Sequence, residues 1–172
     1  MEELELTYLV KNLPDDVLSS PSKELLDIYI PAKVDHPILR IRKSGDKYEI
    51  TKKEPIESGD ASRQLENTIP LTESEFEELA NLTGKRLQKT RFYYKEGDIL
   101  CEIDVFRGDL SGLILADIEF SSVAQKASFQ MPSWCLADVT QEKFIAGGMI
   151  CGKKYNDIVR DLSQFGYQKL TI

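Results

Sequence analysis

The chain has 172 residues, of which 41% are apolar and 30% are charged, with a formal net charge of -7. This length suits a single folded domain, and the acidic balance argues against a general nucleic-acid binder, which must neutralise phosphates. No apolar run approaches the roughly 20 residues that a membrane helix needs. Because the three cysteines lack metal-site spacing and no signal sequence follows Met1, a reducing cytoplasm is expected.

The first half of the chain predicts four strands and one helix. Residues 3–11 predict a strand, because the polar residues Glu3, Glu5 and Thr7 alternate with apolar ones. Residues 22–30 follow a proline and begin with a serine, and they predict a short helix. Strands are expected over residues 37–43 and 48–53, joined by a Gly-Asp turn, and over residues 62–69.

The second half predicts three more strands and several helices. Thr72 and Glu75 have the spacing of a capping box, which opens a helix that Gly84 is expected to end. Strands then follow over residues 85–94, 101–106 and 114–120. Later helices are expected over residues 121–129 and 155–165, with another capped by Thr140. Strands joined mostly by hairpins predict an α+β, mainly antiparallel fold, either a barrel or a strongly curved sheet, with helices outside.

Five of the predicted strands carry two ionic residues of like charge, two positions apart, so that both point to the same sheet face. The pairs are Glu3 and Glu5, Arg40 and Arg42, Lys89 and Arg91, Glu102 and Asp104, and Asp117 and Glu119. A solvated outer face is one explanation. Like charges side by side repel, however. Carboxylates that share a cation and basic groups that share an anion explain the pairs better, and they favour a charged interior.

Six segments form a recognisable ordered set. They are Glu3-Leu4-Glu5-Leu6-Thr7, Leu39-Arg40-Ile41-Arg42, Lys52, Lys89-Thr90-Arg91, Glu102-Ile103-Asp104-Val105-Phe106 with the glycines at 108 and 112, and Asp117-Ile118-Glu119. They resemble, in order, the ExExK motif, the second-strand arginine motif, the tunnel lysine, the KxR motif, the EIDVF stretch and the late acidic pair of the CYTH, or triphosphate tunnel metalloenzyme, family. The resemblance covers about residues 3–140.

The resemblance implies an eight-stranded closed β-barrel tunnel that uses Mg²⁺ or Mn²⁺ and acts on a small substrate bearing a triphosphate. Glu3, Glu5 and Glu119 would hold the metal ion, and Asp104 and Asp117 would support it or bind a second ion. The residues expected to bind the phosphates are Arg40, Arg42, Lys52, Lys89 and Arg91. Glu3, Glu5, Lys52 and Arg91 form the expected catalytic group. Glu66 lies near a further acidic position of the family.

Several functions remain open at this stage. Thr7 stands where the family has lysine, and threonine has neither the charge nor the reach of that residue. The leading hypothesis is hydrolysis of inorganic tripolyphosphate. The alternatives are hydrolysis or cyclisation of a nucleoside or thiamine triphosphate, and a weakened module that binds polyphosphate without turnover.

The rest of the chain adds two expectations. We expect one CYTH-like domain over residues 1–172, with residues 152–172 forming a C-terminal helical extension. The extension has an apolar stripe at helical spacing, which predicts either core packing or the contact of a homodimer. The only histidine, His36, has no second histidine to pair with and is interpreted as structural.

Overall fold

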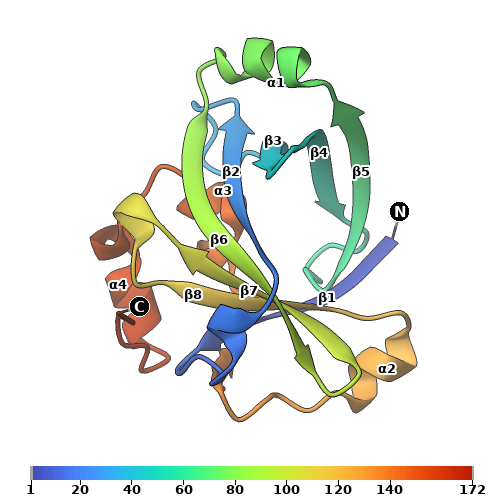
Figure 1. Ribbon diagram of the computed structural model, residues 1–172, viewed down its shortest axis with the longest axis vertical. Helices are drawn as coiled ribbons and strands as arrows, with labels where there is room; N and C mark the ends of the chain where they lie inside the picture. The colour runs from blue at the N-terminus through green and yellow to red at the C-terminus, as the bar shows by residue number, and fades with distance from the viewer. Residues whose placement is uncertain (1, 172) are drawn as a thin grey trace.

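In the computed structural model, which describes residues 2–171, nine antiparallel strands form one sheet (Figure 1). The strands are β1 (Glu2–Val10), β2 (Ser22–Ile30), β3 (Leu39–Ser44), β4 (Lys47–Pro55), β5 (Arg63–Leu71), β6 (Lys85–Glu96), β7 (Ile99–Phe106), β8 (Ile114–Glu119) and β9 (Cys135–Asp138). Their order is β5-β4-β3-β2-β6-β7-β8-β1-β9. Strand β1 also pairs with β5 at residues 2–4, so the first eight strands close into a barrel. The predicted eight-stranded closed barrel is confirmed.

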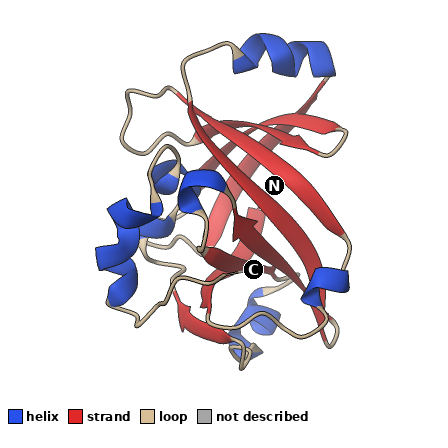
Figure 2. Cartoon of the chain, turned by 60° about the vertical axis from the view of Figure 1, so that its left-hand side comes forward, coloured by secondary structure: helices blue, strands red, loops and turns tan. Residues whose placement is uncertain are grey.

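Seven short helices accompany the barrel. They are η1 (Val17–Ser19), α1 (Glu73–Ala80), η2 (Gly108–Leu110), α2 (Val123–Ser128), η3 (Lys143–Ile145), α3 (Gly147–Ile150) and α4 (Tyr155–Ser163) within the described chain. Figure 2 shows them outside the strands, with α1 beyond one end of the barrel. Between residues 2 and 171, no helix has both the length and the apolar character needed to cross a lipid bilayer.

Apolar side chains pack on both faces of the barrel wall. One cluster covers the outer face of β2 and β3, where Ile28 and Ile41 meet Phe76 of α1. A second covers the outer face of β6, β7 and β8 and includes Phe92, Ile103 and Ile118. The three free cysteines are buried in these and the remaining cluster. The wall is therefore held from outside by apolar burial, which leaves the inner face free for charged residues.

The third apolar cluster closes one end of the interior. Leu87, Phe106 and Leu115 lie on the inner face of the wall and pack against η3, α3 and α4. The stripe of α4 supplies Tyr155 and Ile158 to the same cluster, among other buried residues. This contact agrees with the core-packing interpretation of the stripe, while the division at residue 152 and the homodimer stay predictions.

The prediction of a helix over residues 22–30 is wrong, because this segment is strand β2, paired with β3 and β6. Both faces of β2 are covered: Leu25, Asp27 and Tyr29 line the cavity, while Ile28 lies under α1. A strand that is buried on both faces loses the polar-apolar alternation by which strands are found in sequence. The error concealed Asp27, which proves to be part of the site.

Two smaller predictions about helix ends also differ from the structure. The capping box of Thr72 and Glu75 is confirmed, but α1 ends at Ala80, four residues before Gly84. Thr140 caps no helix; its hydroxyl accepts a hydrogen bond from the backbone N–H of Thr7 and donates one to Asp138. Thr140 therefore ties the segment after β9 to β1.

Candidate functional site

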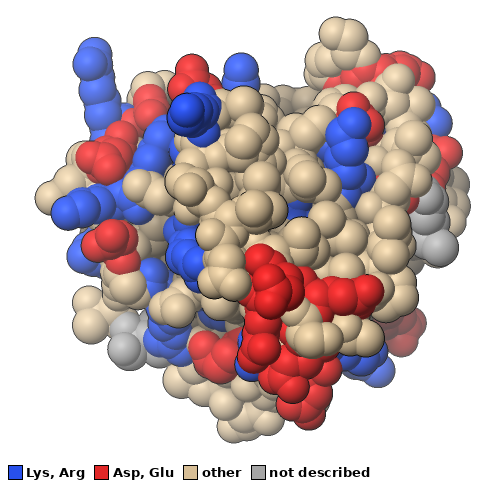
Figure 3. Space-filling view, turned by 90° about the horizontal axis from the view of Figure 1, so that it is seen from above, with Lys and Arg blue, Asp and Glu red and all other residues tan. Residues whose placement is uncertain are grey.

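The barrel encloses a charged cavity of about 490 Å³, lined by side chains from all eight barrel strands. Inward positions follow the two-residue period of each strand, odd numbers on β1 and even numbers on β3, for example. The lining carries both signs of charge, with ten carboxylates and seven lysine or arginine side chains. Seen from the α1 end, acidic side chains also gather in a compact surface patch (Figure 3). The overall charge of the chain therefore says little about the interior, where acidic and basic groups both line the cavity.

One end of the cavity is covered by the segment from Val139 to Ile150. Gly147 lies so close to the wall that a Cβ there would come within 2.1 Å of the hydroxyl of Tyr29. Gly148 would likewise meet the carbonyl oxygen of Pro37 at 2.3 Å. These glycines therefore serve close packing of the cover against the barrel.

A buried carboxylate anchors the first basic pair. Asp27, which is 1% exposed, accepts two hydrogen bonds from Arg42, at 2.6 Å from Nε and 2.8 Å from Nη2. The Nε atom of Arg40 lies 3.9 Å from the same carboxylate. Burial alone would raise the pKa of Asp27, but the charges of Arg42 and Arg40 hold it well below its ordinary value. Asp27 thus fixes two guanidinium groups toward the cavity.

A second buried carboxylate anchors the other basic pair. Asp104 accepts hydrogen bonds from Nε and Nη2 of Arg91 at 2.7 and 2.6 Å, and it also pairs with the ammonium of Lys89. Both oxygens of Asp104 are held by these cations, and its expected role, supporting the metal ion or binding a second one, stays a prediction. Arg91 also pairs with Glu102 and lies 3.3 Å from Asp117.

The four basic side chains form what we term the basic wall: Arg40, Arg42, Lys89 and Arg91. Two fully buried carboxylates, Asp27 and Asp104, face these four cations. Burial, with the nearby positive charges of Arg91 and Arg42, lowers the pKa of Lys89 despite the attraction of Asp104. The buried Nε atom of Arg40 is the one such polar atom in residues 2–171 without a hydrogen-bond partner. An anion in the cavity would give the Nε atom of Arg40 a hydrogen-bond partner and would favour the charged form of Lys89.

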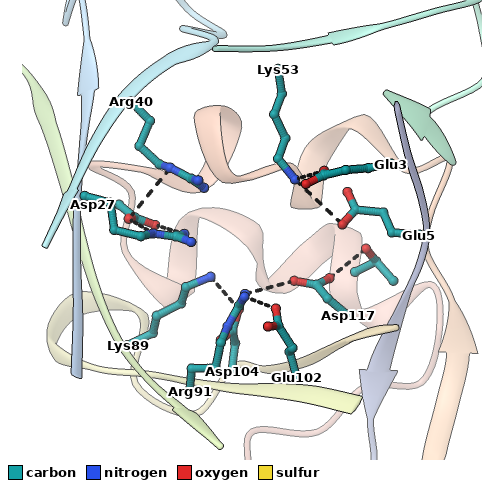
Figure 4. Close-up of polar contacts among 12 residues, drawn as sticks. Glu3, Glu5, Asp27, Arg40, Lys53, Lys89, Arg91, Glu102, Asp104 and Asp117 are labelled. Atoms are coloured by element: carbon teal, nitrogen blue, oxygen red, sulfur yellow. Dashed lines mark hydrogen bonds and ion pairs between the residues drawn. The ribbon is translucent and has the colours of Figure 1, made fainter. Parts of the chain in front are cut away.

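Carboxylates line the opposite side of the cavity (Figure 4). Lys53 pairs with Glu3, and its Nζ atom lies 3.1 Å from Glu66 and 3.9 Å from Glu5. Burial raises the pKa of Glu5 to about 7, helped by the charges of Asp117, Glu3 and Glu119. Burial also raises the pKa of Glu3. In contrast, the hydroxyl of Thr68 and the ammonium of Lys53 outweigh burial and lower the pKa of Glu66 to about 2.

The prediction of Lys52 as a tunnel lysine is wrong, because its side chain points outward. It is 47% exposed and pairs with Glu54 at 3.1 Å on the outer surface. The tunnel lysine is Lys53, one residue later, since a shift of one position moves a side chain to the other sheet face. Ile50, two residues before Lys52 and on the same face of β4, packs toward α1, so the face that α1 covers decides which of the two lysines points inward.

Thr7 and the late acidic pair lie beside the carboxylates of β1. Glu5 is directly opposite Glu119 and Thr7 opposite Asp117 in the register of β1 and β8. The hydroxyl of Thr7 donates a hydrogen bond of 2.8 Å to Asp117. Thr7 is therefore a neutral support for Asp117, at the position where the family motif has a cation.

The donor set on this side suits a hard divalent cation, because it consists of carboxylate oxygens. Glu3, Glu5, Asp117 and Glu119 all line the same cavity. In the described chain, residues 2–171, no three such side chains are arranged as a ready-made metal site. Two of the predicted ligands, Glu3 and Glu5, already attract a cation, the ammonium of Lys53. The chemistry of the residues fits a metal ion, and Lys53 is the group that such an ion would meet.

Comparisons with known proteins agree with this geometry. The chain is 37% identical to the inorganic triphosphatase of Nitrosomonas europaea over 145 residues, which cover 83% of this chain and 92% of the relative. A crystal structure of an inorganic triphosphatase aligns with a TM-score of 0.64 at 29% identity, covering 88% of this chain and 95% of that one. No protein-family model matches the sequence.

A more distant structure shares the fold alone. A protein from Hippeastrum, described as having a dominant triphosphatase activity, aligns with a TM-score of 0.51 at 13% identity, covering all of this chain and 92% of that one. The identity to the bacterial relative and the length of chain it covers, together with the closed barrel and its charged interior, decide the assignment. The chain belongs to the CYTH, or triphosphate tunnel metalloenzyme, family.

Proposed function

We propose that this chain hydrolyses inorganic tripolyphosphate with the help of Mg²⁺ or Mn²⁺. The observation that carries the proposal is the division of one enclosed cavity into a basic wall and a row of carboxylates on the facing side (Figure 4). Members of the family are metal-dependent, and the relative at 37% identity is an inorganic triphosphatase. A substrate that is all phosphate suits a cavity whose specific contacts are nearly all ionic.

The basic wall and the facing carboxylates have separate roles in this proposal. Arg40, Arg42, Lys89 and Arg91 bind the phosphoryl oxygens, and they are held in place by Asp27 and Asp104. Glu3, Glu5 and Glu119 hold the metal ion, with Asp117 beside them. When bound, a divalent cation neutralises the charge that develops on the phosphoryl oxygens. The side chains supply binding and orientation, which are the main sources of rate in phosphoryl transfer.

The direct test is phosphate release from tripolyphosphate by the purified protein. We expect turnover with Mg²⁺ or Mn²⁺, none after chelation, and slower release from ATP, thiamine triphosphate or pyrophosphate. Glu3→Gln is the matched inactive control, because it keeps the size of the side chain and removes one charged ligand. Release that is equal in the wild type and in Glu3→Gln would contradict the proposal.

A second candidate is a polyphosphate-binding module without turnover, which the contact between Thr7 and Asp117 favours. In that function the basic wall still binds the anion, but position 7 lacks the positive charge of the family's motif lysine. Calorimetry that detects tight tripolyphosphate binding, together with no phosphate release under any metal condition, would support this candidate over the first. A cytoplasmic location stays a prediction under either function.

Thr7→Lys is expected to tighten tripolyphosphate binding roughly ten- to hundred-fold, since one charge-assisted hydrogen bond contributes about 1.5–3 kcal/mol. Thr7→Met is the matched control, because it has similar length without the charge and also removes the bond to Asp117. The measurement is the KM, or the calorimetric Kd where turnover is absent. Weaker binding by the lysine variant than by the methionine variant would show that position 7 does not face the phosphates.

A further inference from the structure

Lys53 occupies an unusual position among the basic side chains of the cavity. It lies on β4, directly opposite Glu66 of β5 in the strand register. Its ammonium pairs with Glu3, lies 3.1 Å from Glu66 and 3.9 Å from Glu5, and the side chain is 26% exposed. Lys53 is thus the cation that contacts Glu3 and Glu66, whereas Arg40, Arg42, Lys89 and Arg91 form the basic wall on the facing side.

An ammonium and a divalent ion compete for the same carboxylate oxygens. A divalent ion such as Mg²⁺ takes carboxylate oxygens at about 2.0–2.1 Å and demands near-ideal octahedral geometry. The ammonium already contacts Oε2 of Glu3 and approaches Oε2 of Glu5. Two cations at these oxygens would also repel each other strongly in a site that is largely removed from water. One of them must leave when the other binds.

Lys53 is able to move because its ammonium is carried on a flexible four-carbon stem. Strand β4 is paired with β3, where Arg40 lies opposite Thr51, two residues from Lys53. Figure 4 shows Arg40 and Lys53 extending into the same cavity from neighbouring positions, with Lys53 turned toward Glu3 and Glu5. A phosphate held by Arg40 therefore offers the ammonium an alternative partner within the cavity.

We propose that Lys53 is a built-in competitor of the divalent cation for Glu3 and Glu5. Metal binding displaces the ammonium from these carboxylates and transfers it to the phosphates of the substrate. The inference rests on the proposed metal-dependent function and adds a coupling to it: metal and substrate each strengthen the binding of the other, as reciprocal linkage requires. It also assigns to Lys53 part of the role that Thr7 cannot fill.

The test is the Kd of Mn²⁺ without substrate, from electron paramagnetic resonance of free Mn²⁺ at pH 8 and fixed ionic strength. Lys53→Met is expected to bind Mn²⁺ about tenfold more tightly than the wild type, because the competing charge is gone. With Mn²⁺ saturating, the same variant is expected to bind tripolyphosphate more weakly. Lys52→Met is the matched control, with both affinities unchanged, since Lys52 lies on the outer surface.

The direction of the change in Mn²⁺ affinity separates competition from a purely structural role of Lys53. If Lys53 only held Glu3 and Glu5 in place, Lys53→Met would weaken Mn²⁺ binding. Lys53→Arg keeps the positive charge in a group that binds carboxylates through two donors, and it is expected to weaken Mn²⁺ binding, which provides a second test if the methionine variant folds poorly. Mn²⁺ Kd values that are equal in the wild type and both Lys53 variants would overturn the inference alone. Failure of the wild type to bind Mn²⁺ would overturn the metal assignment and the inference together.

Discussion

Asp104→Asn is expected to lower the free energy of unfolding by about 3–5 kcal/mol, the usual cost of removing one partner from a buried ion pair. Asp104 is 1% exposed and neutralises both Lys89 and Arg91. Asparagine keeps the shape but leaves two buried cations without their common counter-ion. Urea denaturation at pH 7 measures the loss, and tripolyphosphate binding should weaken with it because the basic wall loses its anchor.

The control for this experiment is Glu54→Gln, which breaks an ion pair on the outer surface and should change stability by less than about 1 kcal/mol. The effect of Asp104 also has a definite pH dependence. Its cation partners, Arg91 first, outweigh burial and lower its pKa from 3.8 to about 2. The stabilisation is therefore complete above about pH 4 and is lost as the pH falls through 2. A similar loss for both variants at pH 7 would contradict the anchoring role.

Glu5→Gln is expected to reduce tripolyphosphate turnover by at least about 100-fold, because it removes a charged ligand of the proposed metal site. The same variant is expected to be more stable than the wild type at pH 8. Burial raises the pKa of Glu5 from 4.5 to about 7, so the folded protein keeps a proton that the unfolded chain releases. The stabilisation that this proton gives the folded wild type is complete below pH 4.5 and is lost as the pH rises through 7.

The size of the gain follows from the two pKa values. Ionising Glu5 in the folded protein costs up to roughly 3 kcal/mol, and a neutral glutamine avoids this cost. Thermal or urea unfolding in the presence of a chelator should show Glu5→Gln to be more stable at pH 8 and equal to the wild type at pH 4. A variant that is both inactive and less stable at pH 8 would instead indicate that Glu5 has a structural role.

The two predictions together show that the buried carboxylates of the cavity have opposite effects on stability. Asp104 and Asp27 are carboxylates that stabilise the fold because cations surround them. Glu5 is a carboxylate that destabilises the fold because burial and neighbouring acids oppose its charge. Groups held in an unfavourable state are typical of functional sites, where a ligand supplies what the protein lacks.

The sequence by itself determined most of the site residues and a run of antiparallel strands, which form either a barrel or a strongly curved sheet; the family resemblance implied that the sheet closes. Pairs of like charge two positions apart require a common face, and the repulsion between their members points to shared ligands rather than to solvent. This argument placed Glu3 with Glu5 and Arg40 with Arg42 on common strand faces without any knowledge of strand pairing, and the family resemblance then placed these faces in one interior. Their presence around one cavity agrees with it.

The tertiary structure alone decided three features, each for a physical reason. Asp27 lies on a strand buried on both faces, so its segment carries no period-two signal. The choice between Lys52 and Lys53 depends on which face of β4 lies under α1, and a one-residue error reverses it. The pairing of β1 with β5 joins residues about 60 positions apart and closes the barrel. Short-range patterns do not record such long-range contacts, and these contacts place the ammonium of Lys53 on the carboxylates of β1.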